Sequence, residues 1–376
     1  MEWKEDVLGN VLEVKYGKDH KKLADGQYPV YGSGGLMRYV DSKLYDGPSI
    51  LIPRKGTLSN IMFVDNPFWT VDTMFWSIIN TDKVDPKFLF YSICKRDFAS
   101  MNVGSAVPSM TVNILNDIQI SYPKNIEDQR RIASILSSLD RKIELNNKIN
   151  ADLEEMAQAI FKNWFVDFEP FKDGKFVDSE LGMIPEGWKV ISLSEIMKYN
   201  GGSQPPASEF IDTYQEGYIR FIQIRDYDND SHITYIPISK RNKLCDELDI
   251  MIARYGAALG RICWGLKGAY NVALAKVIPI KSYYREYLRC YLNTSYFYQS
   301  INNKGARCAQ SGFNQSDINS YMIAFPIDET VVMNFNDLCS SIMDKRLSLK
   351  YENSRLSTLR DTLLPRLMSG ELEVPE

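Results

Sequence analysis

The hydrophobic residues of this chain follow two different spacings, which divide it into two kinds of segment. Over residues 1–124 and 173–327, short apolar runs rich in Ile, Val, Tyr and Phe alternate with Gly, Asp and Asn. This pattern is typical of strands with a few short helices. The clearest strand candidates cover residues 49–52, 117–122 and 249–253.

Two long helices are predicted after these mixed stretches. Residues 125–168 and 328–369 are nearly free of glycine and carry apolar residues three and four positions apart. Asn125 and Asp328 stand at the two starts, where a side-chain oxygen can accept hydrogen bonds from the free amide groups of the first turn. We therefore expect each helix to begin directly after its capping residue.

Each long helix carries an apolar seam. Alternating steps of four and three residues meet an apolar side chain at eight of ten positions in the first helix and at seven of nine in the second. A period of 3.5 residues predicts coiled-coil packing. The predicted pairing residues are Ile132, Leu136, Leu139, Ile143, Leu153 and Ile160 in the first helix, and Leu338, Ile342, Leu349, Leu356, Leu359 and Leu363 in the second.

A helix with one apolar stripe needs a partner, because burial of the stripe must offset the entropy of ordering the backbone. We expect the two helices to pack on each other in antiparallel orientation, since a whole domain separates them along the chain. The alternative is that each helix packs only on its own domain. About 40 residues form a rod of roughly 60 Å, so the pair could hold two domains at a fixed distance, as needed to read two sites on a DNA duplex. A dimerisation stalk is the other interpretation.

The chain contains an internal repeat. Trp3 and Trp188 open the two copies, 185 residues apart, and Ile50 and Ile250 follow at a separation of 200. From Ile120 onwards the separation is constant at 203. Self-similarity of this kind indicates a tandem duplication, and the second copy carries about 18 additional residues.

Composition limits the functional class. The 376 residues are 44% hydrophobic and 24% charged, and the charged start of the chain, together with the absence of any long uncharged apolar run, predicts a cytoplasmic protein outside the membrane. The six cysteines form no C-x-x-C pair and there are only two histidines, which disfavours structural zinc and a disulfide framework. The formal charge is -4, and all of the acidic excess lies in residues 125–172 and 328–376, so local basic patches elsewhere are compatible with it.

Catalytic motifs are not found in the sequence. It has no G-x-x-x-x-G-K-[ST] phosphate loop, no G-x-S-x-G elbow and no H-E-x-x-H helix, and such motifs mark several common enzyme classes. The segment 204–207 is only partly similar to a methyltransferase motif, and 32–35 lacks the spacing of a dinucleotide-binding loop. Both are interpreted as turns or loops.

Several segments resemble one known family, in the same order along the chain. They are DQRRIASILSSLD at 128–140, QAIFKNWFVDF at 158–168, LGMIPEGW at 181–188 and LLPRLMSG at 363–370. Together with the duplicated plan, they are similar to the specificity (S) subunits of Type I restriction-modification systems. The resemblance covers essentially the entire chain.

The resemblance implies a mixed α/β (α+β) fold in which two globular target recognition domains are separated by a pair of long antiparallel coiled-coil helices, with an internal pseudo-twofold repeat. The expected domains are target recognition domain 1 over residues 1–124, a central spacer helix over 125–172, target recognition domain 2 over 173–327 and a C-terminal spacer helix over 328–376. Each recognition domain would read one part of a bipartite, asymmetric DNA target.

The resemblance also implies partners. The chain would bind double-stranded DNA and dock two methylase subunits and restriction subunits, without catalytic residues, metal or cofactor of its own. S-adenosylmethionine, ATP and Mg would belong to those partners. The alternative is an orphan or degenerate stalked protein that binds methylase subunits without recognising specific DNA.

The repeat suggests where DNA contacts lie. Arg54 and Lys55, with Thr57 close by, follow an apolar strand candidate, and Arg254 and Tyr255 stand at the equivalent place in the second copy. A guanidinium group can pair with the O6 and N7 edge of guanine, whereas lysine more often meets phosphate. A surface salt bridge, or an arginine stacked inside the domain, is the alternative for each.

Further polar candidates precede the long helices or lie in the additional material. Amide side chains can pair with adenine, and hydroxyl groups with a base or a phosphate; ordinary turn and capping roles are the alternative. We also expect Arg225 to lie on a polar stripe of a strand that runs from Arg220. The remaining candidates are Ser109, Thr111, Arg307, Gln310 and Asn314.

Overall fold

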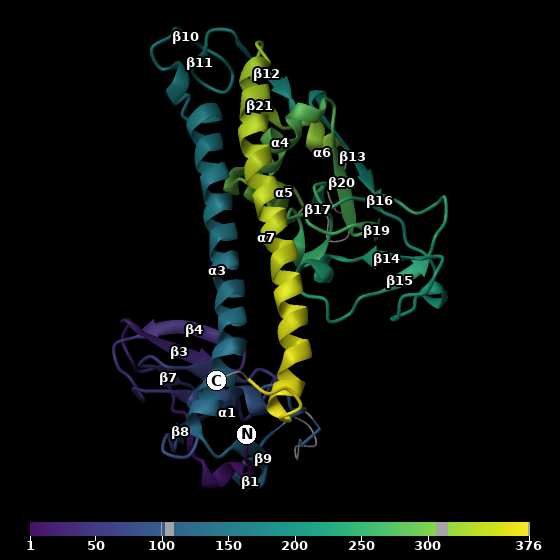
Figure 1. The fold of residues 1–376 in the computed structure, drawn as a ribbon. Helices are drawn as coiled ribbons and strands as arrows, with labels where there is room; N and C mark the ends of the chain where they lie inside the picture. Colours follow the sequence, from purple (N-terminus) through teal and green to yellow (C-terminus); the bar gives the residue numbers. More distant parts are fainter. Residues whose placement is uncertain (99, 102–108, 306–314, 375–376) are drawn as a thin grey trace. The chain divides into compact units, whose positions relative to one another are not determined.

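The computed structural model describes the whole chain except residues 99, 102–108, 306–314 and 375–376. It is a mixed α/β structure with two compact units (Figure 1). Unit 1 contains residues 1–144 and 353–376, and unit 2 contains residues 145–352. Each unit therefore includes part of both long helices.

Unit 1 is built around a sheet whose strands run in the order β2, β8, β5, β6. A second sheet has the order β4, β3, β7, and β1 pairs separately with β9. The strands are β1 (Trp3–Val7), β2 (Leu12–Tyr16), β3 (Tyr28–Gly32), β4 (Gly35–Val40), β5 (Ser49–Pro53), β6 (Met62–Val64), β7 (Trp69–Thr70), β8 (Met74–Ile79) and β9 (Gln119–Pro123). The short helices are α1 (Pro86–Ile93) and α2 (Val112–Asn116).

Unit 2 repeats this plan, with one additional edge strand in its second sheet and a separate two-stranded sheet of β10 and β11. Its central sheet has the order β13, β20, β17, β18, its second sheet the order β15, β14, β19, β16, and β12 pairs with β21. The strands are β10 (Phe176–Val177), β11 (Ile184–Pro185), β12 (Trp188–Ser192), β13 (Met197–Gly201), β14 (Tyr218–Ile222), β15 (Tyr235–Pro237), β16 (Leu244–Cys245), β17 (Ile250–Ala253), β18 (Ile262–Cys263), β19 (Gly268–Tyr270), β20 (Leu274–Pro279) and β21 (Met322–Pro326). The shorter helices are α4 (Arg285–Leu292), α5 (Ser295–Gly305) and α6 (Gln315–Asn319).

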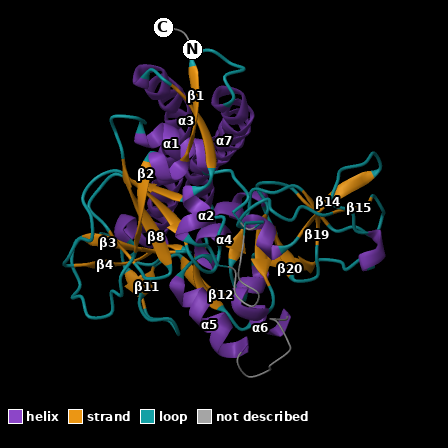
Figure 2. Cartoon of the chain, turned by 90° about the horizontal axis from the view of Figure 1, so that it is seen from below, coloured by secondary structure: helices purple, strands orange, loops and turns teal. Residues whose placement is uncertain are grey.

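Strand register confirms the internal repeat. Trp3 pairs with Pro123 across β1 and β9, and Trp188 pairs with Pro326 across β12 and β21. The strand directions in the second sheets show the same repeat, because β3 runs parallel to β7 and β14 runs parallel to β19. Most of the additional residues of the second copy fall between β13 and β17, where unit 2 has the edge strand β16. The strands of both copies are orange in Figure 2.

The long helices are α3 (Ile126–Phe165) and α7 (Thr330–Met368). Both predicted caps are confirmed. Asn125 Oδ1 accepts a hydrogen bond from the Glu127 amide, and Asp328 Oδ1 accepts one from the Thr330 amide, each at 3.0 Å. The bond from the Thr330 hydroxyl, followed by the amide bond, lowers the pKa of Asp328 from its ordinary value, since both stabilise the charged carboxylate.

The two helices pack in antiparallel orientation within unit 2, as predicted (Figure 1). Asn146 of α3 donates a hydrogen bond of 2.9 Å to Glu352 of α7. Further along α3, Glu154 forms an ion pair with Arg346, which stands earlier in α7. Near the end of α3, the rings of Phe165 and Phe335 meet edge to face at 5.0 Å.

Unit 1 shows the same orientation at the other ends of the two helices. The Arg360 guanidinium of α7 donates to Asp140 of α3 at 2.6 Å. Leu364 and Leu367 of α7 lie in one buried core with Ile132 and Leu136 of α3 and with residues of α1 and β2. The alternative in which each helix packs only on its own domain is therefore wrong, because α7, which follows the second copy, completes the core of the first.

The seam prediction needs correction at two positions. Leu338 and Leu359 remain 46% and 47% exposed. The neighbouring residues lie inward instead: Cys339 is 1% exposed, and Arg360 contacts α3 through Asp140. At Leu359 the prediction failed because it counted apolar residues only, whereas the seam includes the paired Arg360; at Leu338 the neighbouring Cys339 takes the buried position.

The other predicted pairing residues are buried to different degrees. Those with fully buried side chains are Ile132, Leu136, Ile342 and Leu349. Those with half-buried side chains are Leu139, Ile143, Leu153, Ile160, Leu356 and Leu363.

Candidate nucleic-acid interface

The two predicted arginines occupy equivalent places in the two central sheets. Arg54 directly follows β5, and Arg254 directly follows β17. Each backbone amide donates a 2.8 Å hydrogen bond to the neighbouring chain segment, Arg54 to Thr73 and Arg254 to Ala273. Both side chains therefore start from fixed backbone at the end of a buried strand.

Each guanidinium group lies over a tyrosine ring. Arg54 Cζ is 5.6 Å from the ring centroid of Tyr16, the last residue of β2. Arg254 Cζ is 6.0 Å from the ring of Tyr199 in β13 and 5.1 Å from that of Tyr255. In each sheet this tyrosine lies two strands away from the arginine, across β8 or β20. Cation–π contacts of this kind stabilise by about 0.5–1 kcal/mol at exposed sites.

Each arginine is followed two residues later by a glycine in left-handed conformation. Gly56 has a φ of 88° and Gly256 has a φ of 69°. A side chain is disfavoured there, because its Cβ approaches the following carbonyl oxygen. The chain therefore turns shortly after each arginine in both copies, and the arginine stands at the tip of the strand.

Most guanidinium groups of the described residues bind a carboxylate, but these two do not. Arg220 and Arg261 in unit 2 form ion pairs with Asp230 and Asp228, both at 2.6 Å. In the described part of the chain, Arg54 and Arg254 have neither a side-chain hydrogen bond nor an ion pair, and Nε of Arg254 is buried without an acceptor. Apart from this buried Nε, their donors are thus available to an acceptor-rich ligand.

Other predicted residues gather around Arg54. Lys55 forms a backbone bridge with Ser109, and the Met110 amide donates to the Arg54 carbonyl at 2.9 Å. Thr57 is exposed on the same loop. Thr111 has a capping role, because its hydroxyl accepts from the Ile114 amide at the start of α2. The structure therefore brings the first-copy candidates together, although one of them serves the local fold.

Sequence reasoning missed two contributors to this site. Nothing in the local pattern marked Tyr16, because it meets Arg54 only through the sheet order. Asn60 donates a hydrogen bond of 2.8 Å to the Ser33 carbonyl, which ties the turn between β3 and β4 to the loop after β5. The predicted loop character of residues 32–35 agrees with this turn.

The candidates in the second copy are more dispersed. The strand β14 ends at Ile222, and Arg225 lies in a short 3₁₀ helix (Ile224–Tyr227) with Asp226 at 3.9 Å. The predicted strand through Arg225 is therefore wrong. The cause is the bond from the Gln223 amide to the Asp226 carboxylate, which caps the helical turn. The last three candidates, Arg307, Gln310 and Asn314, lie outside the described residues.

The acidic loop after β14 is fully engaged with protein partners. Arg261 donates to Asp228 and lowers the pKa of that carboxyl group, whereas burial raises the pKa of Asp226. Asp230 is held by Arg220. Among the residues that the structure describes, no cluster of three or more His, Cys, Asp or Glu side chains could hold a metal ion.

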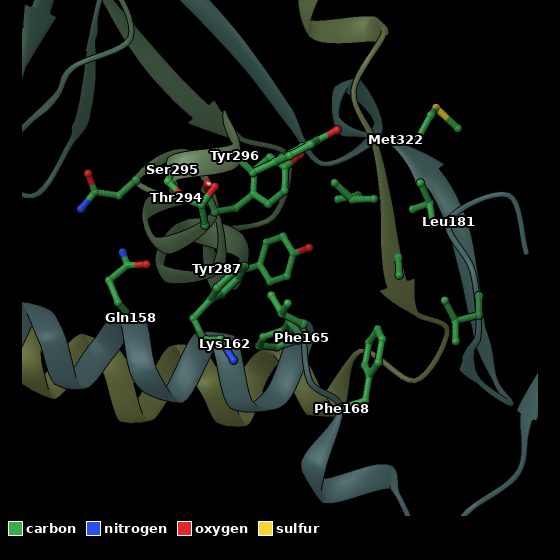
Figure 3. A pocket seen from close by; sticks show the side chains of 17 residues that line it. Gln158, Lys162, Phe165, Phe168, Leu181, Tyr287, Thr294, Ser295, Tyr296 and Met322 are labelled. Carbon is green, nitrogen blue, oxygen red and sulfur yellow. Dashed lines mark hydrogen bonds between the residues drawn. The ribbon is translucent and has the colours of Figure 1, made fainter. Parts of the chain in front are cut away.

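Each unit also has a cavity beside a long helix. In unit 2 it measures about 700 Å³ and is lined by Phe165, Tyr287 and Met322 among others (Figure 3). In unit 1 a cavity of about 420 Å³ is lined by Leu364 and Met368 of α7, with α1 opposite. Leu364 and Met368 are the repeat equivalents of Phe161 and Phe165, which line the larger cavity.

The fold and these sites define a tandem-repeat protein whose two copies each present an arginine at the end of a central strand. The chain belongs to the family described as Type I restriction modification DNA specificity domain, whose model matches residues 1–155 and 185–348. Within the described residues, no helix has the length and apolarity needed to cross a membrane.

Relatives agree with this family, and a solved structure agrees with the fold. The MjaIX specificity subunit of a Type I restriction enzyme from Methanocaldococcus jannaschii is 28% identical, over 95% of this chain and 86% of the relative. The HindI specificity subunit from Haemophilus influenzae is 26% identical, over 83% of each chain. A crystal structure of the S subunit from M. genitalium has the same fold, with a TM-score of 0.65, 16% identity and coverage of 98% of this chain and 96% of that one.

Proposed function

We propose that this chain is the DNA sequence-specificity subunit of a Type I restriction-modification complex and reads a bipartite, asymmetric target. Target recognition domains over residues 1–124 and 173–327 would each read one part. The spacer helices over 125–172 and 328–376 would set the distance between the parts.

One observation supports this proposal above the others. Arg54 and Arg254 occupy equivalent strand ends in the two copies, and each lies on a tyrosine ring without a carboxylate partner among the described residues. Each copy therefore offers hydrogen-bond donors of a cationic side chain to a ligand. Such a pair suits a ligand with two similar but separate surfaces of hydrogen-bond acceptors, and duplex DNA is a ligand of this kind. Lys55, Thr57 and Ser109 would add contacts in the first part of the target, and Tyr255 and Arg225 in the second, together with Arg307, Gln310 and Asn314.

The chain would have no catalytic residues of its own in this complex. Two methylase subunits, with S-adenosylmethionine, and restriction subunits, with ATP and Mg, would supply methyl transfer and cleavage. Exposed apolar side chains on the long helices, such as Met156, Met333 and Leu338, and the two repeat-related cavities support docking of one methylase subunit at each copy.

The test is a DNA selection experiment with the reconstituted complex. The chain is combined with its methylase subunits and offered a library of random duplexes, and the bound fraction is sequenced. The proposal expects one enriched motif with two defined parts and unspecified bases between them. A complex that assembles but enriches no motif would instead support the orphan, non-specific protein.

A further inference from the structure

The arginine at each strand end differs from most of the other described arginines in how it is held. Ion pairs fix Arg220, Arg261, Arg346 and Arg360 to carboxylates. Arg54 and Arg254 are instead held by tyrosine faces. A carboxylate would occupy the planar fork of N–H donors, whereas an aromatic face leaves that fork open at its edge.

In the second copy, a glycine leaves space for the guanidinium group of Arg254. Gly201 is the last residue of β13, and a Cβ atom built there would lie 2.9 Å from Nη1 of Arg254. No positive φ requires glycine at this position. The absent side chain therefore makes room for the arginine, between Tyr199 of the same strand and Tyr255.

We propose that each part of the DNA target contains a guanine, read by Arg54 in one part and by Arg254 in the other, and that Tyr16, Tyr199 and Gly201 are positioning residues for these two side chains. This inference rests on the proposed function. A guanidinium group held flat can donate two parallel hydrogen bonds to O6 and N7 of guanine in the major groove. The rigid strand end fixes the origin of the side chain, and the tyrosine face restricts its orientation.

The two reading positions are not identical. Beside Arg54 stands Lys55, whereas beside Arg254 stands Tyr255. Lysine is a compact charge that suits a phosphate, and tyrosine adds a second stacking face to the arginine. Replacement of Lys55 by Ala therefore weakens binding at all sequences, with a smaller salt dependence, and leaves the base preference unchanged.

The experiment compares base preference at every target position for the reconstituted complex, by the same DNA selection. Arg254→Lys keeps the charge but removes the planar fork, and we expect it to lower the preference for one G·C pair about 5- to 150-fold in one part only. Arg54→Lys does the same in the other part. Arg261→Lys, whose arginine binds Asp228 in the same unit, is the matched control and keeps the wild-type preference.

The positioning residues have a separate readout. Tyr199→Phe retains the ring and preserves the G·C preference, whereas Tyr199→Leu reduces it at the position that Arg254→Lys affects. Gly201→Ala displaces only the flexible end of Arg254 and shifts the preference at that same position. Equal effects of Phe and Leu at Tyr199 would overturn the positioning role.

The DNA selection tests the proposed function and the guanine contacts separately. If the wild-type complex enriches no motif, the proposed function fails. If it enriches a two-part motif in which either part lacks a G·C pair, or in which Arg254→Lys changes no position, only the guanine-reading inference is overturned.

Discussion

At the level of single residues, each arginine of the candidate site lies on a tyrosine ring, Arg54 on Tyr16 and Arg254 on Tyr199. Arg54 and Arg254 were found because the repeat places both after an apolar run. Tyr16 and Tyr199 could not be found in this way, since each reaches its arginine across an intervening strand. The pairing of sheet strands is a long-range property that local periodicity does not contain.

Arg346 is another residue that periodicity missed. It is 8% exposed, forms an ion pair with Glu154 and stacks on Trp264 at 4.6 Å. We expect Arg346→Ala to lower the free energy of unfolding by about 1–4 kcal/mol, because Glu154 loses its partner and the packing on Trp264 is lost. The measurement is urea unfolding. Arg355→Ala, an exposed position of the same helix, is the control and changes stability by less than about 0.5 kcal/mol; equal losses would contradict a structural role for the pair.

The hydrogen bonds of Glu329, the residue just before α7, predict that the stability of the fold depends on pH. It accepts hydrogen bonds from Lys281 and Tyr283, which lower its pKa to about 2. Because the folded-state pKa lies below the ordinary value, the stabilisation is present above about pH 4.5 and is lost as the pH falls towards 2. We expect Glu329→Gln to cost up to about 1 kcal/mol at pH 7, a small value because the pair is partly exposed. In unfolding series at decreasing pH, the difference in the free energy of unfolding between Glu329→Gln and wild type should shrink. A constant difference would exclude the charged Glu329 carboxylate as its cause.

At the element scale, most of the secondary structure was predictable. The strand candidates 49–52 and 249–253 correspond to β5 and β17, and both long helices begin one or two residues after their predicted caps. These features depend on local chemistry, namely buried apolar runs and side-chain capping. The register of the seam is less accurate at Leu338 and Leu359, because Cys339 and the ion-paired Arg360 take the inward positions beside them.

The seam register can be tested directly on α7. Ile342 is 8% exposed, whereas Leu338 is 46% exposed, although simple periodicity assigns both to the seam. We expect Ile342→Ala to lower the free energy of unfolding by about 2–4 kcal/mol through lost burial and a cavity. Leu338→Ala should change it by less than about 0.5 kcal/mol. Both are measured by denaturant unfolding of the full chain, and similar losses at the two positions would show that Leu338 belongs to the seam after all.

At the scale of the whole molecule, the two units show why one chain carries two copies of a domain and two long helices. Each helix completes the core of a unit together with the other, as Leu364 does beside Ile132. We therefore propose that the helices act as a spacer between two DNA-reading domains. The sequence predicted the duplication fully, because a repeat is visible without any knowledge of packing.

Helix length should then control the spacing of the target. One heptad inserted into both α3 and α7 lengthens each by about 10 Å, or about three base pairs at 3.4 Å each, and preserves the period of the seam. We expect the preferred DNA spacer to grow by about this amount while both defined parts stay the same. A DNA selection with the variant complex measures it. An unchanged spacer would show that the helices do not set the distance.

The proposed role of this chain is to give a modification complex its two-part DNA specificity. The most direct measurement is a map of adenine methylation across the genome in cells with and without this gene. We expect deletion to remove methylation at one motif made of two short defined parts separated by unspecified bases. Unchanged methylation, or loss at a motif that is a single continuous sequence, would contradict the claim.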